Sequence, residues 1–280
     1  MKPRNKIQPL PFVLPALFVY ILTVIIPILW SMGYSLFSWN GIGVRMFQDE
    51  TFREAVVNNL KFVVLGSLFQ LCAGLILAIL LTHISKGGNI LRVIYFIPCI
   101  ISSMAICQIF SKMLSVQPQG LVCYVMEKLG MEPIALLANS HTALITITLI
   151  DGYKYCGLYM IIFYSAFVSI SKDVIEASTM DGCNVFQQYR YIKLPLVKNI
   201  FSIVIVMLVN GCLKTFDVFY ILDNKSRSTE MVATYMYKTA FNSADFGYGS
   251  TLSVFLVIEC LVAVGIIQKC LGSAKGDGSE

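Results

Sequence analysis

The sequence predicts an all-α membrane protein with six transmembrane helices, and three observations lead to this prediction. Hydrophobic residues make up 57% of the 280 residues, whereas charged residues make up only 13%. A soluble domain carries about 25% charged residues, and the mean hydropathy of +0.74 points the same way. Apolar runs of about 20 residues, the length that crosses the hydrocarbon core of a bilayer, recur along the chain. So few charges cannot cover a surface in water, and lipid is therefore an expected partner.

The first span is predicted over residues 12–32. It lies in a stretch between Lys6 and Arg45 that contains no charged residue. Pro15 and Pro27 fall inside the span, where neighbouring helices can satisfy the backbone groups that a proline leaves unpaired. The apolar run is too long for the hydrophobic part of a cleavable signal peptide, so we expect it to remain in the membrane.

Five further spans follow. They are predicted over residues 60–81, between Arg92 and Lys112, and over 142–168, 199–222 and 250–269. Six spans place both termini on one side of the membrane. With the termini in the cytoplasm, the inner segments hold more Lys and Arg than the outer ones, as the positive-inside rule requires. The inner residues are Lys2, Arg4, Lys6, Lys86, Arg92, Lys172, Arg190, Lys193, Lys198, Lys269 and Lys275.

These spans divide the chain into three parts. We expect a cytoplasmic N-terminus over residues 1–11, a six-span domain over 12–270 and a cytoplasmic tail over 271–280. The net charge of +5 is scattered over short loops, so no nucleic-acid partner is expected. The nine cysteines include no C-x-x-C pair and most lie in apolar runs, which predicts neither a disulfide framework nor a metal site.

Among the segments expected on the inner side, only the inner loop over residues 169–199 is predicted to form regular secondary structure. Asp173 and Glu176 have the D-x-x-E form of a capping box, which predicts a helix from about Val174 to Asp181. Gly182 is the expected left-handed stop of that helix. A glycine elbow at the inner face of the membrane follows from this pattern.

A second short helix is predicted from about Val185, with Leu194–Pro195 breaking it before the fifth span. The two helices would expose several apolar side chains, namely Val174, Ala177, Met180, Val185 and Phe186. Such a surface suits insertion into a groove on a partner protein. An interfacial helix that lies on lipid would have the same pattern.

The loop also resembles a known motif. The string E-A-S-x-x-D-G-x-x-x-x-Q-x-Y-x-x-I-x-L-P-L runs from Glu176 to Leu196. It resembles the EAA loop of bacterial ABC importer permeases of the carbohydrate type, the maltose and glycerol-phosphate permeases. Ser178, Cys183 and Lys193 depart from the usual pattern by small or conservative changes. Further similar segments cover nearly the whole chain, and they are residues 14–43, 91–98, 215–222 and 239–254.

This resemblance implies a type I ABC importer permease fold with a cytoplasmic coupling helix, in the bacterial inner membrane. The implied partners are a second homologous permease subunit, a cytoplasmic ATPase dimer and an extracytoplasmic sugar-binding protein. The outer segments over 33–58, 115–140 and 223–249 would receive the binding protein. ATP would be bound by the partner subunits, because the chain contains no G-x-x-x-x-G-K-[ST] loop. No catalytic residue and no cofactor of its own are expected.

The resemblance also assigns residues to the coupling of ATP hydrolysis to transport. They are Glu176, Ala177, Asp181, Gly182, Leu194 and Pro195. The two acids would contact the ATPase and Gly182 would allow the tight elbow. Glu176 would serve equally well as a helix cap only, and both interpretations stay open.

Ionisable side chains inside the predicted spans need a reason, because each costs about 2.5–3.5 kcal/mol at mid-bilayer on insertion scales. Asp151 with Lys154, and Lys214 with Asp217, have the i,i+3 spacing that allows pairing on one helix face. Glu259 has no obvious local partner. The charges either neutralise one another or line a path for the solute. The candidate path residues are Tyr153, Lys154, Asn210, Lys214, Phe216, Asp217 and Tyr220.

Two other classes of protein compete with the importer. A secondary transporter would also carry ionisable residues in its spans, but it has no use for an EAA loop. A membrane enzyme would need a motif such as D-G-x-x-A-R, H-E-x-x-H or G-x-S-x-G, and the sequence contains none of these.

Overall fold

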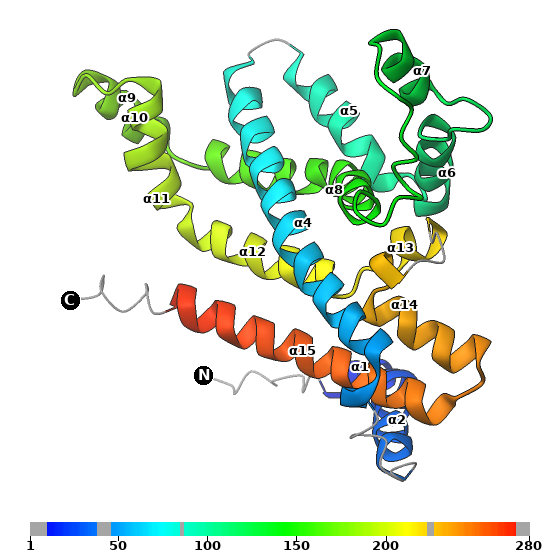
Figure 1. The fold of residues 1–280 in the computed structure, drawn as a ribbon. Helices are drawn as coiled ribbons and strands as arrows, with labels where there is room; N and C mark the ends of the chain where they lie inside the picture. The colour runs from blue at the N-terminus through cyan, green and yellow to red at the C-terminus, as the bar shows by residue number, and fades with distance from the viewer. Residues whose placement is uncertain (1–9, 38–45, 85–86, 223–226, 273–280) are drawn as a thin grey trace, which may run out of the picture.

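The computed structural model describes residues 10–37, 46–84, 87–222 and 227–272. Every regular element in these ranges is a helix (Figure 1). Four helices are long and apolar enough to cross a membrane, and the number rises to six if each of two bent helix pairs is one span. The predicted all-α class is therefore confirmed, and six is the upper count of spans that these helices allow.

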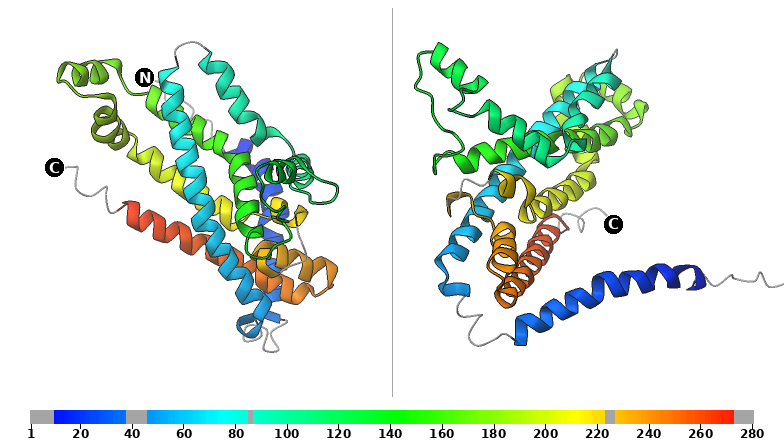
Figure 2. Two further views of the ribbon diagram at one scale, coloured as in Figure 1. Left: turned by 45° about the horizontal axis from the view of Figure 1, so that its top comes forward. Right: turned by 90° about the vertical axis from the view of Figure 1, so that its right-hand side faces the viewer.

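The first span consists of α1 (Leu10–Tyr20), a π-helical turn η1 (Ile21–Ile25) and α2 (Ile26–Phe37). Its membrane-length part, Val13–Ser31, has no residue buried inside the chain. Its first half, α1, stands apart from the other helices in the right-hand view of Figure 2. Its second half, α2, packs against α15 (Phe246–Gly272). The π-turn directly precedes Pro27 and shifts the hydrogen-bond pattern just before a residue that has no N–H to donate.

The long helix α4 (Glu50–His83) contains the second predicted span but begins ten residues earlier. Asp49 caps it, with Oδ1 accepting from the backbone N–H of Thr51 at 2.9 Å. Its Oδ2 accepts from Tyr235 at 2.5 Å and from Tyr248 at 2.7 Å. Burial raises the pKa of Asp49, but the hydrogen bonds outweigh burial and hold the pKa below its usual 3.8. This carboxylate ties α4 to α14 (Val232–Tyr237) and α15.

The third predicted span, between Arg92 and Lys112, is wrong as a single straight helix. It is broken into α5 (Gly88–Ile100) and α6 (Ser103–Met113), which meet at 94°. Pro98 lies inside the last turn of α5, and Ile101 leaves the helix in an extended conformation. Proline and paired serines are common causes of such kinks, and Ser102–Ser103 follow at once. The short helix α7 (Leu121–Lys128) continues beyond α6.

Helix α8 (Ala143–Val168) is the fourth predicted span and packs between α4 and α5. Two close approaches require glycine on these helices. A Cβ at Gly157 would lie 1.9 Å from the backbone oxygen of Tyr95 on α5, and a Cβ at Gly74 would lie 2.9 Å from the Cβ of Tyr159. Small residues let membrane helices approach closely in this way.

The fifth predicted span is interrupted near its C-terminal end. It comprises α12 (Lys198–Leu213) and α13 (Asp217–Ile221), with a non-helical break between them. The short elements η3 (Arg227–Thr229), α14 and η4 (Lys238–Asn242) then lead into α15, which contains the sixth predicted span. Buried cores form where α8 packs on α4 and α12, around residues such as Phe62, Phe163 and Leu208.

Candidate functional site

The loop over residues 169–199 contains the helix that its sequence predicts, with a different start. Helix α9 covers Lys172–Met180 and its N-cap position is Ser171. The capping box predicted at Asp173 and Glu176 is therefore wrong. Asp173 lies in the first turn instead, where a negative charge faces the positive end of the helix dipole. Glu176 does not cap the helix and its side chain is exposed.

The predicted glycine elbow is confirmed by the backbone. Gly182 has a φ of +80°, a left-handed conformation that favours glycine. Its N–H donates to the carbonyl of Thr179, and the N–H of Cys183 donates to that of Ser178, both at 3.0 Å. These two bonds close the C-terminus of α9 in the manner of a Schellman motif.

The segment after the elbow is helical for longer than predicted. It runs through α10 (Val185–Gln187), the π-helix η2 (Gln188–Lys193) and α11 (Leu194–Leu196). The predicted break at Leu194–Pro195 is wrong, because the π-turns before Pro195 keep the chain helical up to a turn at Val197. Asn184 and Gln187 form the real capping box, with bonds of 2.9 and 2.8 Å. The N-x-x-Q pattern in the sequence was the missed signal.

One side of this loop is anchored to the helical body. Tyr189 is buried, bonds to Thr82 and packs edge-on against Phe167 at 5.5 Å between ring centroids. Gln188 donates to the hydroxyl of Thr179 at 3.0 Å, which joins η2 to α9. The two arms of the elbow are therefore tied both to each other and to the end of α8.

The other side of the loop is exposed, as its pattern predicted. The side chains of Met180 and Phe186 are 89% and 76% exposed. Val174, Ala177 and Val185 are exposed as well, and so are Glu176 and Asp181. In Figure 1 this surface lies at one extreme of the molecule, far from α14 and the start of α15. The predicted coupling residues Leu194 and Pro195 lie on α11, where Leu194 is half-buried and Pro195 exposed.

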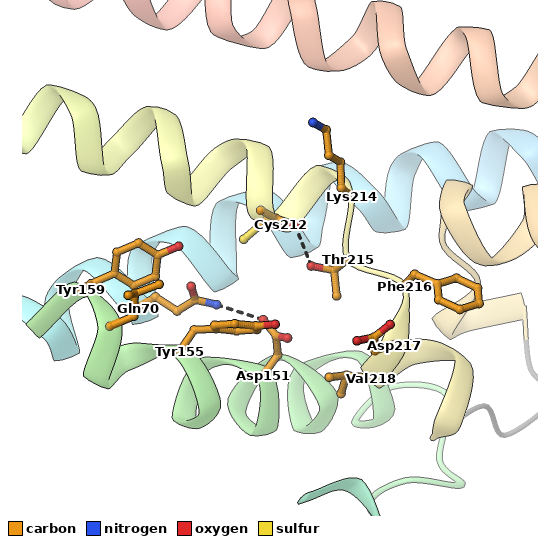
Figure 3. Close-up of a pocket in the computed structure, with 12 residues that line it drawn as sticks. Gln70, Asp151, Tyr155, Tyr159, Cys212, Lys214, Thr215, Phe216, Asp217 and Val218 are labelled. Atoms are coloured by element: carbon orange, nitrogen blue, oxygen red, sulfur yellow. Dashed lines mark hydrogen bonds between the residues drawn. The ribbon is translucent and has the colours of Figure 1, made fainter. Parts of the chain in front are cut away.

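A second candidate site is a pocket of about 260 Å³ between α4, α8 and the break from α12 to α13 (Figure 3). The lining groups include Gln70 from α4, Tyr155 from α8, and Phe216 and Asp217 from the break. Asp151 of α8 also lines the pocket and is 1% exposed. Its Oδ2 accepts from Gln70 at 3.0 Å, and its Oδ1 has no hydrogen-bond partner in the described part of the chain.

Pairing of Asp151 with Lys154 and of Lys214 with Asp217 was one of the two alternatives that the i,i+3 spacing left open. No ion pair among the described residues joins Asp151 to Lys154 or Lys214 to Asp217. Instead, the Lys154 ammonium donates to Ser103 Oγ at 2.5 Å, and the Ser103 hydroxyl donates to Asp217 Oδ2 at 3.0 Å. Lys154 is buried, and its ammonium also donates to the hydroxyl of Tyr155 on α8 at 3.3 Å. Lys214 contributes to the pocket lining, but its ammonium points away from Asp151 and Asp217 in Figure 3.

The other predicted path residues divide into two groups. Lys214, Phe216 and Asp217 line the pocket, and Lys154 reaches Asp217 through Ser103. Tyr153, Asn210 and Tyr220 are outside the lining: Tyr153 packs on Phe110, Asn210 bonds within its own helix, and Tyr220 stacks on Phe216.

Sequence reasoning passed over Ser103, Tyr155 and Gln70 as site residues, because nothing in their local sequence distinguishes them. Glu259 lies half-buried on α15, and its Oε2 has no hydrogen-bond partner among the described residues.

Comparison with known proteins then decides the family. A model of the family described as binding-protein-dependent transport system inner membrane component matches residues 70–274, which is more than half of the chain. The chain belongs to this family. The resemblance noted in the sequence is confirmed, and so is the nature of the chain as a membrane permease of a transport system.

Curated relatives match over most of their length. The chain is 28% identical to the probable ABC transporter permease protein YurN of Bacillus subtilis, over 95% of this chain and 96% of YurN. It is 30% identical to the osmoprotective compounds uptake permease protein GgtC of Synechocystis, over 88% and 92%. It is 26% identical to the arabinooligosaccharides transport system permease protein AraP of Bacillus subtilis, over 82% and 75%.

The fold matches solved importers. One is the crystal structure of a bacterial ABC transporter involved in the import of the acidic polysaccharide alginate. The TM-score is 0.86 at 20% identity, with 94% of each chain covered. The same kind of transporter in complex with an alginate pentasaccharide-bound periplasmic protein gives a TM-score of 0.88 at 21% identity, over 96% of this chain and 95% of that one. The predicted ABC importer permease fold is thereby confirmed.

Proposed function

We propose that this chain is one of the two permease subunits of an importer for a sugar or sugar-like solute. An external binding protein delivers the solute, and ATP hydrolysis on separate subunits drives its transport. The observation that carries this proposal is the rigid elbow at Gly182, which presents α9 on an exposed surface. The names of relatives support the sugar: a xylose/arabinose import permease protein, XacH, and a lactose transport system permease protein, LacF, are among them.

The loop fits the part of a coupling element. In this proposal residues 169–199 and both termini face the cytoplasm, and α9 inserts into a cleft of an ATPase subunit. Met180 and Phe186 supply apolar contacts, while Glu176 and Asp181 supply polar ones. Because Tyr189 packs on Phe167 at the end of α8, a movement of the loop driven by nucleotide is passed to α8 as to a rigid body.

The pocket fits the part of a solute site. Asp151 Oδ1, the free oxygen of Asp217 and the hydroxyl of Tyr155 offer hydrogen bonds to sugar hydroxyls, and Phe216 offers a ring to sugar C–H groups. Asp151 and Phe167 lie on the same helix, so the pocket and the coupling loop share α8. A shift of α8 driven from the loop would therefore change the pocket.

The test is transport by the assembled complex. The permease, its sister permease, the ATPase and the binding protein are reconstituted in proteoliposomes, and uptake of a labelled panel of mono- and oligosaccharides is measured. We expect uptake of at least one saccharide that requires both ATP and the binding protein. Uptake that persists without the ATPase subunits would make the chain a secondary transporter. Transport of other solutes but of no saccharide would refute the proposal that the solute is a sugar.

A further inference from the structure

Phe216 is the first of five aromatic rings that contact one another in sequence from the pocket outward. Its ring stacks on Tyr220 at 4.9 Å and 20°, and it lies 5.2 Å from Tyr237. Tyr237 lies 5.0 Å from Phe241, which in turn meets Phe246 at 6.3 Å. We call these five residues, Phe216, Tyr220, Tyr237, Phe241 and Phe246, the aromatic track.

The track is assembled from elements that are separate in the sequence. Phe216 precedes α13, Tyr237 ends α14, Phe241 lies in the π-helix η4 and Phe246 starts α15. A Cβ at Gly249 would lie 2.7 Å from the Cβ of Ala240, so this glycine lets η4 pack directly on α15. That close approach brings Phe241 against Phe246 and makes the row continuous.

The rings are not a buried core. Tyr220, Phe241 and Phe246 are 38%, 65% and 59% exposed, whereas the core phenylalanines Phe62 and Phe163 are fully buried. An aromatic belt at a membrane interface also exposes rings. The track differs from a belt because it begins inside a pocket lined by the carboxylates of Asp151 and Asp217.

We propose that the aromatic track binds linear oligosaccharides, with successive sugar units packed by their C–H faces on successive rings between the start of α15 and the pocket. This inference rests on the proposed function and adds a substrate class to it. A single sugar would occupy the pocket alone, whereas a chain of several sugars would also occupy the track. The rings nearest the start of α15 therefore matter only for long substrates.

The test measures transport against chain length. Phe241 is chosen because its exposed ring can be removed without opening a core. Wild-type importer, Phe241→Ala and the ring-preserving Phe241→Tyr are reconstituted with their partners, and uptake is measured for linear arabino-, xylo- and α-1,4-gluco-oligosaccharides of one to six units. Phe18→Ala is the matched control, because Phe18 is also exposed, at 67%, and lies outside the track and outside the segments expected to receive the binding protein.

For every series that the wild type imports, we expect Phe241→Ala to leave the KM for the monosaccharide unchanged and to raise the KM for the longest chains about tenfold, equivalent to 1.4 kcal/mol. Phe241→Tyr and Phe18→Ala should behave as wild type at every length. The proposed binding of oligosaccharides to the track would be overturned by a change in KM that is equal at all chain lengths, or by no change at any length. A wild type that imports only monosaccharides would also overturn it. In each of these cases the proposed sugar import would stand. A wild type that imports no saccharide at all would refute the proposed function itself.

Discussion

Replacing Gly182 by valine tests the elbow most directly. A Cβ at this position has nothing within 4 Å of it, so the substitution introduces no clash. Its whole effect comes from the backbone, because φ is +80°. An L-residue held in the left-handed region costs about 1–2 kcal/mol, and a branched Cβ adds to that cost.

The magnitudes decide what the variant does. Relaxing the elbow to a negative φ would break the two bonds from the N–H groups of Gly182 and Cys183, which are worth about 0.5–1.5 kcal/mol each. The strain of valine and the worth of these bonds are therefore comparable, and a substantial fraction of molecules should adopt a relaxed elbow. In that state α9 no longer holds its angle to η2.

The assay compares ATP hydrolysis with uptake in the same proteoliposomes. We expect Gly182→Val to reach the membrane and to unfold only a few degrees below wild type, but to hydrolyse several times more ATP per solute imported. Gly182→Asn is the matched control, since asparagine tolerates the left-handed region, and it should stay close to wild type. Wild-type uptake and stoichiometry in the valine variant would refute the account of the elbow.

Three further predictions follow from single contacts. Phe186→Asp, which replaces an exposed ring by a charge, should raise the dissociation constant for the ATPase subunits at least about tenfold. Phe47→Asp should leave that constant unchanged. Equal binding of both variants in a pull-down titration would contradict the proposed docking of the loop on the ATPase. Ser103→Ala removes the hydroxyl between Lys154 and Asp217 and should cost about 1–3 kcal/mol of stability with reduced uptake; unchanged unfolding and uptake would show that the link is dispensable. Asp49→Asn should lower the unfolding temperature at pH 7. The difference from wild type should shrink as the pH falls below the usual pKa of 3.8 and vanish only below the lowered pKa of the folded state, because the carboxylate stabilises the fold only while it is ionised there. A difference that persists at still lower pH would contradict this.

Local features were predicted well from the sequence. The glycine elbow, the exposed apolar residues beside it and the membrane-length helices all follow from patterns within one segment, such as a glycine after a helix or an uninterrupted apolar run. The start of α9 was misplaced because Ser171, two residues before Asp173, is also of a residue type common at N-caps. The helix begins directly after Ser171, whose side chain makes no capping hydrogen bond.

Contacts between segments were predicted poorly. The i,i+3 spacing of Asp151 and Lys154 correctly places both side chains on one side of α8, but it says nothing about the neighbours on that side. Asp151 meets Gln70 of α4, while Lys154 meets Ser103 of α6. The second contact exists only because the chain bends by 94° just before Ser103, and a single straight span would have carried that serine elsewhere.

The same bend bears on how the proposed coupling between the loop and the pocket would work. Because the chain bends by 94° after α5, two differently oriented helices pack on α8. Helix α5 contacts α8 closely at Gly157, and α6 meets it at the pocket through an apolar cluster around Ile147 as well as through Ser103 and Lys154. Interlocked apolar side chains resist sliding. The proposed coupling therefore requires α8 to move as a rigid body together with α5 and α6, carrying Asp151 of the pocket with the loop end of the helix.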